Sequence, residues 1–357
     1  MKLIDKYILK KFLGAFVFTV LIIVSVILVI DVTEKTDKFV KAGVSTGEIL
    51  SYYLDFIPWI ANFITPLTTF IATVFITAQM AGRTEIVAIL SSGVSFRRML
   101  LPYFIGASAI ATLSFVLTGW IIPNSNKSRL AFEIEHLKSK FYYNERNIHL
   151  QVAPNTYLYM RSYNNQSNVG YNFTLERVEG TQLKEKLSAN RISWDNNKEK
   201  WKLTTWKTLS IDSALETLDK GKEMDTTLAI HPSEFENNYR NYDGMTIDEL
   251  NGEIDKLTLR GASNVEIYQV EKYTRFTSPF AILILTFMGV IVSSKKTRGG
   301  AGFQIALGFL LSFLFIIFFI LSKSIAEAGN MHPMLGVWIP NIVFGGISLL
   351  MYKYVPR

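Results

Sequence analysis

The sequence contains no cysteine, only four histidines and few charged residues for its length. The absence of cysteine excludes disulfide bonds, thiolate metal sites and a cysteine nucleophile. The histidines lack the spacing of metal ligands, so we predict neither a metal site nor a catalytic site. Charged residues make up 19% of the 357 residues, whereas about a quarter of an average soluble domain is charged. With a hydrophobic content of 49%, this deficit argues against a cytosolic enzyme.

Long apolar runs lie at both ends of the chain, and the middle is polar. A membrane-spanning helix needs about 20 mostly apolar residues. Six runs come close to this length, namely 12–30, 56–81, 99–122, 276–292, 303–321 and 334–352. We therefore predict six spans, grouped three and three, with kinks at Pro58 and Pro66 in the second. A signal peptide is the competing interpretation of the first run, but that run ends without a small-x-small cleavage site and more spans follow.

Basic residues in the short loops predict the orientation, because they favour the cytoplasmic side. With the amino terminus inside, the inside segments carry a net charge of +10 and the rest of the chain −3. The inside basic residues are Lys2, Lys6, Lys10, Lys11, Arg83, Arg97, Arg98, Lys295, Lys296, Arg298, Lys353 and Arg357. We therefore expect both termini inside and the polar middle outside. The net charge of +7 then reflects membrane topology, and we do not expect nucleic acid as a partner.

The polar middle of the chain predicts an inserted β-domain. Aromatic and β-favouring residues are concentrated in the segments 156–163, 187–194 and 201–206. Short strands with Asn-rich turns favour an antiparallel sandwich or an open roll. We interpret the tryptophans as core residues, with ligand contact as the alternative. A capping-box spacing at Thr246 predicts that a helical connector follows.

These patterns predict four regions along the chain. Residues 1–123 form the first three spans, with a short cytoplasmic helix at about 83–98, and 124–245 form the β-domain. Residues 246–275 form the helical connector, and 276–357 form the last three spans.

The loop between the second and third spans is the most informative segment. Ile86, Ile89 and Leu90 follow helical spacing, and Gly93 marks a helix end. A short helix that carries one carboxylate, Glu85, and is flanked by arginines is suited to dock into a cytoplasmic partner. An interfacial helix that merely turns the chain is the alternative, and these residues leave both open.

Several short segments also carry a resemblance. They are 4–8 (IDKYI), 83–87 (RTEIV), 92–95 (SGVS), 268–273 (YQVEKY) and 338–341 (WIPN). In this order, and within a layout of three spans, β-domain and three spans, they resemble the LptF/LptG (YjgP/YjgQ) family of lipopolysaccharide export permeases. The amino-terminal segment is more similar to the LptG type. The resemblance covers the entire chain.

The resemblance implies a polytopic α-helical membrane protein with an inserted periplasmic antiparallel β-jellyroll-like domain. It implies a permease subunit of an ABC-type exporter in the bacterial inner membrane, which extracts lipopolysaccharide for outer-membrane biogenesis. The implied partners are a second permease subunit of the same family, a dimeric LptB-like cytoplasmic ATPase, LptC/LptA-like periplasmic jellyroll bridge proteins and lipopolysaccharide. The chain has no GxxxxGK[ST] phosphate loop, so ATP and Mg belong to the partner and the chain itself is not an enzyme.

The resemblance also implies two groups of site residues. By position, the helix around Glu85 is the coupling helix that contacts the ATPase. The candidates there are Arg83, Glu85, Ile86, Ile89 and Leu90. Basic residues at the outer end of the first span contact lipid phosphates in the family. In that region the candidates are Lys35, Lys38 and Lys41, although Glu34 and Asp37 reduce the net positive charge. Lys127 and Arg129, which follow the third span, are further candidates because an anionic lipid needs cationic groups at the outer leaflet. For each lysine the alternative is a solvated charge in a loop.

Two other functions compete with this interpretation. An ion-driven secondary lipid transporter usually carries an Asp, Glu or His inside a span. Here Asp55, Lys323 and Glu327 lie near the outer boundary of the predicted spans, where we expect their side chains to snorkel. A non-transporting envelope scaffold is the other alternative. A scaffold has no reason to bind an ATPase, so co-purification of an ATPase with the chain would argue against it.

Overall fold

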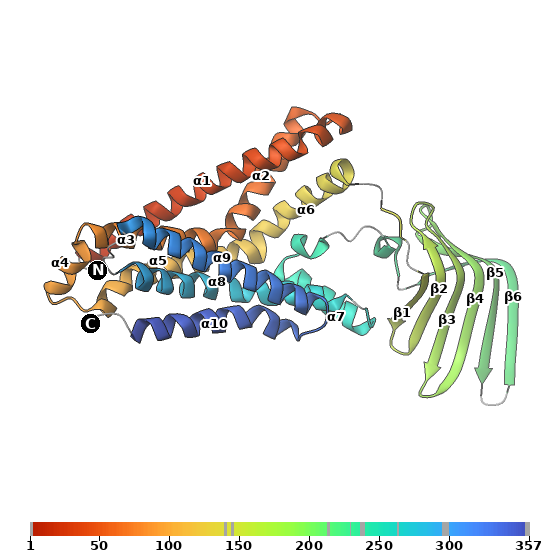
Figure 1. The fold of residues 1–357 in the computed structure, drawn as a ribbon. Helices are drawn as coiled ribbons and strands as arrows, with labels where there is room; N and C mark the ends of the chain where they lie inside the picture. Colours follow the sequence, from red (N-terminus) through yellow and green to blue (C-terminus); the bar gives the residue numbers. More distant parts are fainter. Residues whose placement is uncertain are drawn as a thin grey trace. The chain divides into compact units, whose positions relative to one another are not determined.

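The computed structural model describes residues 3–138, 141–143, 146–212, 215–228, 230–235, 240–262, 264–294 and 300–353 (Figure 1). The chain divides into two compact units. The helical unit comprises Met1–Leu137, Tyr242–Asn251 and Glu266–Arg357, and the β-unit comprises Lys138–Asn241 and Gly252–Val265. Five of the predicted inside basic residues, Lys2, Lys295, Lys296, Arg298 and Arg357, lie outside the described residues.

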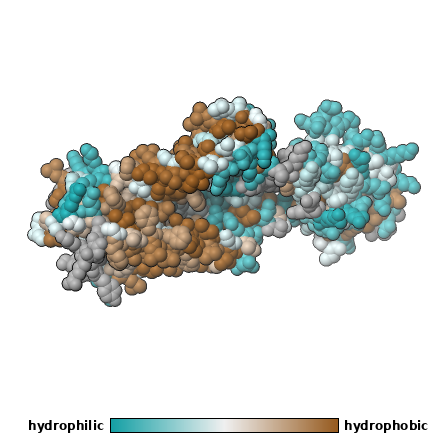
Figure 2. All heavy atoms as spheres, turned by 45° about the horizontal axis from the view of Figure 1, so that its top comes forward, coloured by the Kyte–Doolittle hydropathy of each residue, from teal (hydrophilic) through white to brown (hydrophobic). Residues whose placement is uncertain are grey.

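The helical unit contains the candidate membrane spans. Its helices are α1 (Leu3–Ala42), α2 (Thr46–Phe63), α3 (Thr65–Gly82), α4 (Glu85–Ser91), α5 (Phe96–Val116), α6 (Ile122–Phe132), α8 (Val265–Ser293), α9 (Gly300–Glu327) and α10 (Pro333–Lys353). In the described part of the chain, five helices are long and apolar enough to cross a membrane, and the bent pair of α2 and α3 makes six if it is counted as one span. Figure 2 shows hydrophobic residues over much of the visible face of this unit. The protein is therefore a multi-pass membrane protein with an inserted antiparallel sheet, as the sequence predicts.

The second span is broken where one of its prolines lies. The axes of α2 and α3 differ by 58°, and Ile64 lies between the two helices. Pro66 occupies the first turn of α3, where its missing N–H costs no helical hydrogen bond. Pro58 lies inside α2, which continues past it. The predicted kink is therefore located at the second proline.

The third span is longer than the sequence suggested. Helical structure continues from α5 through a π-helical turn (Leu117–Ile121), α6 and a second π-helical turn (Glu133–Leu137). Pro123 does not end this helix, because it lies in the first turn of α6 after the π-helical turn. The expectation that the β region begins at residue 124 is therefore wrong, and the first strand begins at Arg146.

The β-unit is built on one antiparallel sheet of six strands in chain order (Figure 1). They are β1 (Arg146–Ala153), β2 (Thr156–Asn164), β3 (Val169–Glu179), β4 (Gln182–Asp195), β5 (Lys200–Asp212) and β6 (Leu215–Thr226). Alternate residues of neighbouring strands, such as Met160, Phe173 and Leu203, are buried in a core on one face. Trp201 is 1% exposed in this core, and its indole N–H donates to the carbonyl of Ile230 at 2.8 Å. Trp201 is thus the core residue that the sequence predicts.

The capping box predicted at Thr246 opens α7 (Ile247–Leu259). The Thr246 hydroxyl accepts from the Glu249 backbone N–H at 3.3 Å, and the Glu249 carboxylate accepts from the Thr246 N–H at 2.8 Å. Gly261 follows α7 with a φ of +63°, which favours glycine and ends the helix before α8 begins.

Helices α9 and α10 approach closely at a glycine, which gives a first testable prediction. A Cβ at Gly336 would lie 2.4 Å from the Cβ of Ala326, whereas a Cβ at Gly346 on the same helix meets nothing within 4 Å. We expect Gly336→Ala to lower the free energy of unfolding by about 1–3 kcal/mol because α10 must move away from α9. A lower Tm in detergent for Gly336→Ala than for Gly346→Ala is the expected result. Equal Tm values would contradict this packing.

Candidate functional site

The loop between α3 and α5 contains the short helix α4. Thr84 precedes it with a φ of +61°, a conformation that is strained for a β-branched residue. Gly93 follows it with a φ of +87°, and Ser95 then caps α5 by accepting from the N–H of Arg98. The helix of Glu85–Ser91 is therefore shorter than the segment 83–98, and it is held between two backbone positions of restricted conformation.

The carboxylate of Glu85 contacts the amino-terminal end of α1. The Tyr7 hydroxyl donates to Glu85 Oε2 at 2.9 Å, and Lys11 Nζ lies 3.3 Å from the same oxygen. The Glu85 side chain is 25% exposed. A second contact joins the same end of α1 to the other flank of the loop, because Arg98 on α5 donates to the buried carboxylate of Asp5.

These five residues form what we call the α1–α4 latch: Asp5, Tyr7, Lys11, Glu85 and Arg98. Its geometry brings together two segments that the sequence singled out separately, 4–8 and 83–87. The ion pairs Lys11–Glu85 and Arg98–Asp5 are partly buried and also hydrogen-bonded. They therefore hold α1 against both sides of the α4 loop more firmly than solvent-exposed pairs can.

The apolar residues predicted for partner contact face the helical unit itself. Ile86 is 2% exposed and belongs to the same buried cluster as Ile8 and Met99, and Ile89 and Leu90 pack against that cluster. The exposed residues of α4 are Val87, Ala88 and Ser91, and Arg83 is exposed just before it. Helical spacing thus located a real apolar face, but that face is the buried one.

The candidate lipid contacts at the end of α1 fall into two groups. Lys35 is engaged within the protein: its Nζ lies 2.8 Å from Asp31 Oδ1 and donates to the Tyr52 hydroxyl at 2.6 Å. Lys38 and Lys41 are exposed on the last turns of the helix. Lys38 and Lys41 can therefore contact an anionic ligand directly, whereas Lys35 would first have to leave Asp31 and Tyr52.

Lys127 on α6 is half-exposed and forms an ion pair of 2.8 Å with Glu249. The hydrogen bond from Lys127, together with the backbone hydrogen bond from Thr246, holds the pKa of the Glu249 carboxyl below its ordinary value. Lys127 therefore joins α6 to the start of α7.

Arg129 is buried, with 2% of its surface exposed. Its guanidinium donates to Glu133 at 3.1 Å and to Asn126 at 3.0 Å, and it lies 4.4 Å from the centre of the Trp59 ring. Glu133 also accepts from the Tyr52 hydroxyl at 3.0 Å. Arg129 thus connects α6 with α2 and is not displayed to a ligand. Its burial could not be inferred from the sequence, although the i,i+4 spacing of Arg129 and Glu133 is a local signal.

A partly buried charge cluster between α8 and α9 could not be found from the sequence. Glu271 pairs with Arg275 at 3.0 Å and with Lys323 at 3.4 Å, and Lys323 also pairs with Glu327 at 3.7 Å. Lys323, which the sequence places near the outer boundary, thus pairs with a carboxylate of the neighbouring helix and with one on its own helix. Glu271 lies within the segment 268–273, one of the segments that carry the family resemblance.

We compared the chain with known proteins to find which family has this arrangement of spans, sheet and loop. None of the curated proteins compared with the chain matches it. The family model described as lipopolysaccharide export system permease LptF/LptG matches residues 6–354, nearly the whole chain. The chain belongs to the LptF/LptG family of lipopolysaccharide export permeases.

Proposed function

We propose that the chain is one permease half of an ABC-type lipopolysaccharide exporter in the bacterial inner membrane, of the LptG type. A second family subunit completes the membrane part, and a separate dimeric ATPase binds ATP and Mg and supplies the energy. Both termini lie in the cytoplasm and the β-unit lies in the periplasm. The observation that carries this proposal is the family match over residues 6–354.

The α4 loop supports coupling to an ATPase. Its outer face, with Arg83 and Val87, is open for contact, while its inner face packs on the helical unit. Closure of the ATPase dimer on ATP moves α4, and the α1–α4 latch carries this movement to α1. The spans then close around the lipid and expel it outwards. In this mechanism, Ile86, Ile89 and Leu90 anchor α4 to the spans that it moves.

The sheet supports transfer to periplasmic bridge proteins. Strands β1 and β6 lie at its two edges, and each has only one neighbouring strand among the described residues. An edge strand presents free backbone donors and acceptors, to which a strand of another β-domain can add. The β-unit can thus continue into the jellyroll of a bridge protein, which receives the lipid.

The partly buried cluster of Glu271, Arg275 and Lys323 is the observation that favours the second candidate, an ion-driven secondary lipid transporter. Titratable groups inside spans are typical of proton-coupled carriers. In an exporter half, the same cluster holds α8 against α9.

Co-purification tests the proposal. The full chain, expressed with the other transport genes of its host and solubilised in detergent, is expected to retain a small soluble ATPase. Lipopolysaccharide is expected to stimulate ATP hydrolysis by this complex in nanodiscs. Transport that follows an ion gradient without a bound ATPase would support the secondary transporter instead, and absence of both activities would support the scaffold.

Charge reversal of Lys38 and Lys41 tests the lipid-phosphate contact. Each lysine near an anionic surface contributes about 1 kcal/mol of attraction, so Lys38→Glu/Lys41→Glu is expected to raise the lipopolysaccharide concentration for half-maximal ATPase stimulation by about ten-fold or more. Glu34→Lys/Asp37→Lys, on the same exposed turns, is expected to lower it. Unchanged stimulation in the first variant rules out these lysines as anchors.

A further inference from the structure

The pleat of the sheet is interrupted along one line that crosses several strands. Between β3 and β4, Phe173 pairs with Ala189 and Tyr171 pairs with Arg191. Asn172 and Asn190, which lie between these two pairs, are not paired with each other. The same interruption occurs at Thr205 in β5 and Lys222 in β6.

Two residues on this line have positive φ values, +52° at Asn172 and +54° at Thr205. Such values are uncommon outside glycine and cost conformational energy, and strained positions of this kind cluster at functional sites. The strain occurs on β3 and again on β5, on either side of β4, so it belongs to an irregularity that crosses the sheet and not to one isolated turn.

A second row of side chains runs beside this line. The register pairs Tyr159 with Thr174, Thr174 with Ser188, Ser188 with Lys207, and Lys207 with Lys220. Directly opposed residues point to the same face of a sheet, and neighbouring residues along a strand point to opposite faces. Because the adjacent positions Met160, Phe173 and Ala189 are buried in the core, this row lies on the face opposite to the core.

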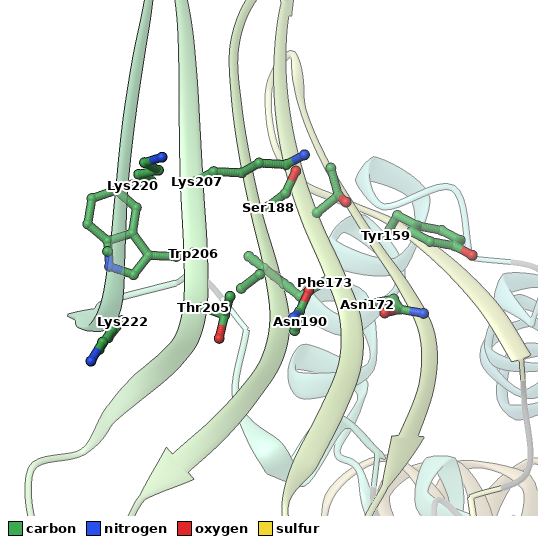
Figure 3. A pocket seen from close by; sticks show the side chains of 13 residues that line it. Tyr159, Asn172, Phe173, Ser188, Asn190, Thr205, Trp206, Lys207, Lys220 and Lys222 are labelled. Atoms are coloured by element: carbon green, nitrogen blue, oxygen red, sulfur yellow. The ribbon is translucent and has the colours of Figure 1, made fainter.

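A groove of about 640 Å³ lies along the two rows. Figure 3 shows Asn172, Asn190 and Thr205 in a line across three strands, with Lys207, Lys220 and Lys222 on β5 and β6. Over β3 and β4 the groove is lined by amides and hydroxyls together with Phe173 and Ala189, and at the β5–β6 end by Trp206 and the three ammonium groups. All of these residues belong to the β-unit.

The three lysines carry charge that the sheet itself does not neutralise. Lys207 and Lys220 are directly opposite each other, and like charges in this position destabilise a sheet. In the described part of the β-unit, no ion pair within 4 Å joins Lys207, Lys220 or Lys222 to a carboxylate. By contrast, Lys186 pairs with Glu176 at 2.6 Å and Lys202 pairs with Glu223 at 2.8 Å. Lysines elsewhere on this sheet are thus balanced by cross-strand carboxylates, and those of the groove are not.

The side chains that line the groove indicate which kind of ligand it can bind. Amide and hydroxyl side chains both donate and accept hydrogen bonds, which matches the hydroxyl groups of a sugar. Ammonium groups attract phosphate or carboxylate. An acyl chain in this groove would remove the same polar groups from water without compensating hydrogen bonds, which is unfavourable.

We propose that this groove binds an oligosaccharide that carries phosphate or carboxylate groups. The asparagine and hydroxyl side chains of β3 and β4 contact the sugar, and Lys207, Lys220 and Lys222 contact its anionic substituents. The inference rests on the proposed function in one respect, namely that the saccharide is the polar part of the exported lipopolysaccharide. An anionic glycan from another source offers the same chemistry, and the test separates the two.

The test measures binding to the full chain in nanodiscs by calorimetry. The probe is the phosphorylated oligosaccharide that remains after complete deacylation of lipopolysaccharide, and the second probe is the same oligosaccharide after phosphatase treatment. We expect Lys207→Gln/Lys220→Gln to weaken binding of the first probe at least ten-fold. The matched control Lys186→Gln/Lys202→Gln removes the same charge from the same sheet and is expected to change binding less than two-fold. The groove variant is also expected to keep its Tm, because it relieves the repulsion between two opposed lysines.

Equal affinity of the wild type and the groove variant for the first probe overturns the proposal, as does an equal loss in both double variants. Equal affinity for the two probes overturns contact of the lysines with phosphate. Binding of the probe by a chain that retains no ATPase supports the groove with a glycan from another source, and contradicts the proposed function. Conversely, lipopolysaccharide-stimulated ATP hydrolysis without any probe binding contradicts the groove and leaves the proposed function standing.

Discussion

Glu85→Ala is expected to reduce lipopolysaccharide-stimulated ATP hydrolysis and lipid transport by about 5- to 150-fold, the range of a typical coupling free energy of 1–3 kcal/mol. The substitution removes the carboxylate that Tyr7 and Lys11 hold, so α4 can move without moving α1. The side chain is partly exposed and its loss leaves no cavity in the core, and the variant is therefore expected to reach the membrane in normal amount. ATP hydrolysis by the reconstituted complex, with and without lipopolysaccharide, measures the effect.

The α1–α4 latch makes a second variant decisive. If Glu85 acts through α1, then Tyr7→Phe/Lys11→Met removes the same contacts from the other side and is expected to uncouple the complex to a similar degree. Lys10→Met, which neutralises an exposed lysine next to Lys11 in the sequence, is the matched control and is expected to behave as the wild type. Uncoupling by Glu85→Ala alone would mean that Glu85 contacts the ATPase directly, and normal coupling in both variants would refute the lever mechanism.

The spans could be predicted because hydropathy is summed over a local run of residues, and no tertiary information is needed. The helix through residues 122–137 could not, because many of its residues are polar and Pro123 lies in its first turn. The π-helical turn before Pro123 allows the helix to continue, and such a turn leaves no clear signal in the sequence. The sheet was predicted from its aromatic strands, but the interruption at Asn172 and Asn190 depends on pairing between strands.

Within the candidate site, sequence reasoning found positions and not partners. Glu85 was singled out from its loop, but Tyr7 and Lys11 are more than 70 positions away in the sequence. Periodicity identified Ile86 as part of an apolar face, yet it does not say whether that face meets a partner or the protein's own spans. The same limit applies to Arg129, because the sequence does not show whether a basic residue lies on the surface or in a buried ion pair.

The burial of Arg129 leads to the last prediction. Removing one partner of a buried ion pair costs about 3–5 kcal/mol, because the other charge remains in a medium of low polarity. In Arg129→Met the carboxylate of Glu133 stays beside Tyr52 without the guanidinium that now neutralises it. The Tm in detergent is therefore expected to fall markedly. Lys127→Met, which breaks a half-exposed pair two positions earlier, is expected to change the free energy of unfolding by less than about 1 kcal/mol.

A third variant separates a role in folding from contact with lipid phosphate. Arg129→Met/Glu133→Gln removes both charges of the closer pair and keeps a side chain that can hydrogen-bond to Tyr52, so part of the lost Tm is expected to return. The recovery is incomplete because the buried carboxylate of Asp243, 3.8 Å from the guanidinium, still loses its ion pair with Arg129. If Arg129 serves the fold, this double variant regains lipopolysaccharide-stimulated ATP hydrolysis together with its Tm. If Arg129 instead contacts the lipid, as its position in the sequence suggested, the stimulation stays low although the Tm recovers. The 2% exposure of Arg129 and its contacts with Glu133, Asn126 and Trp59 favour the first result.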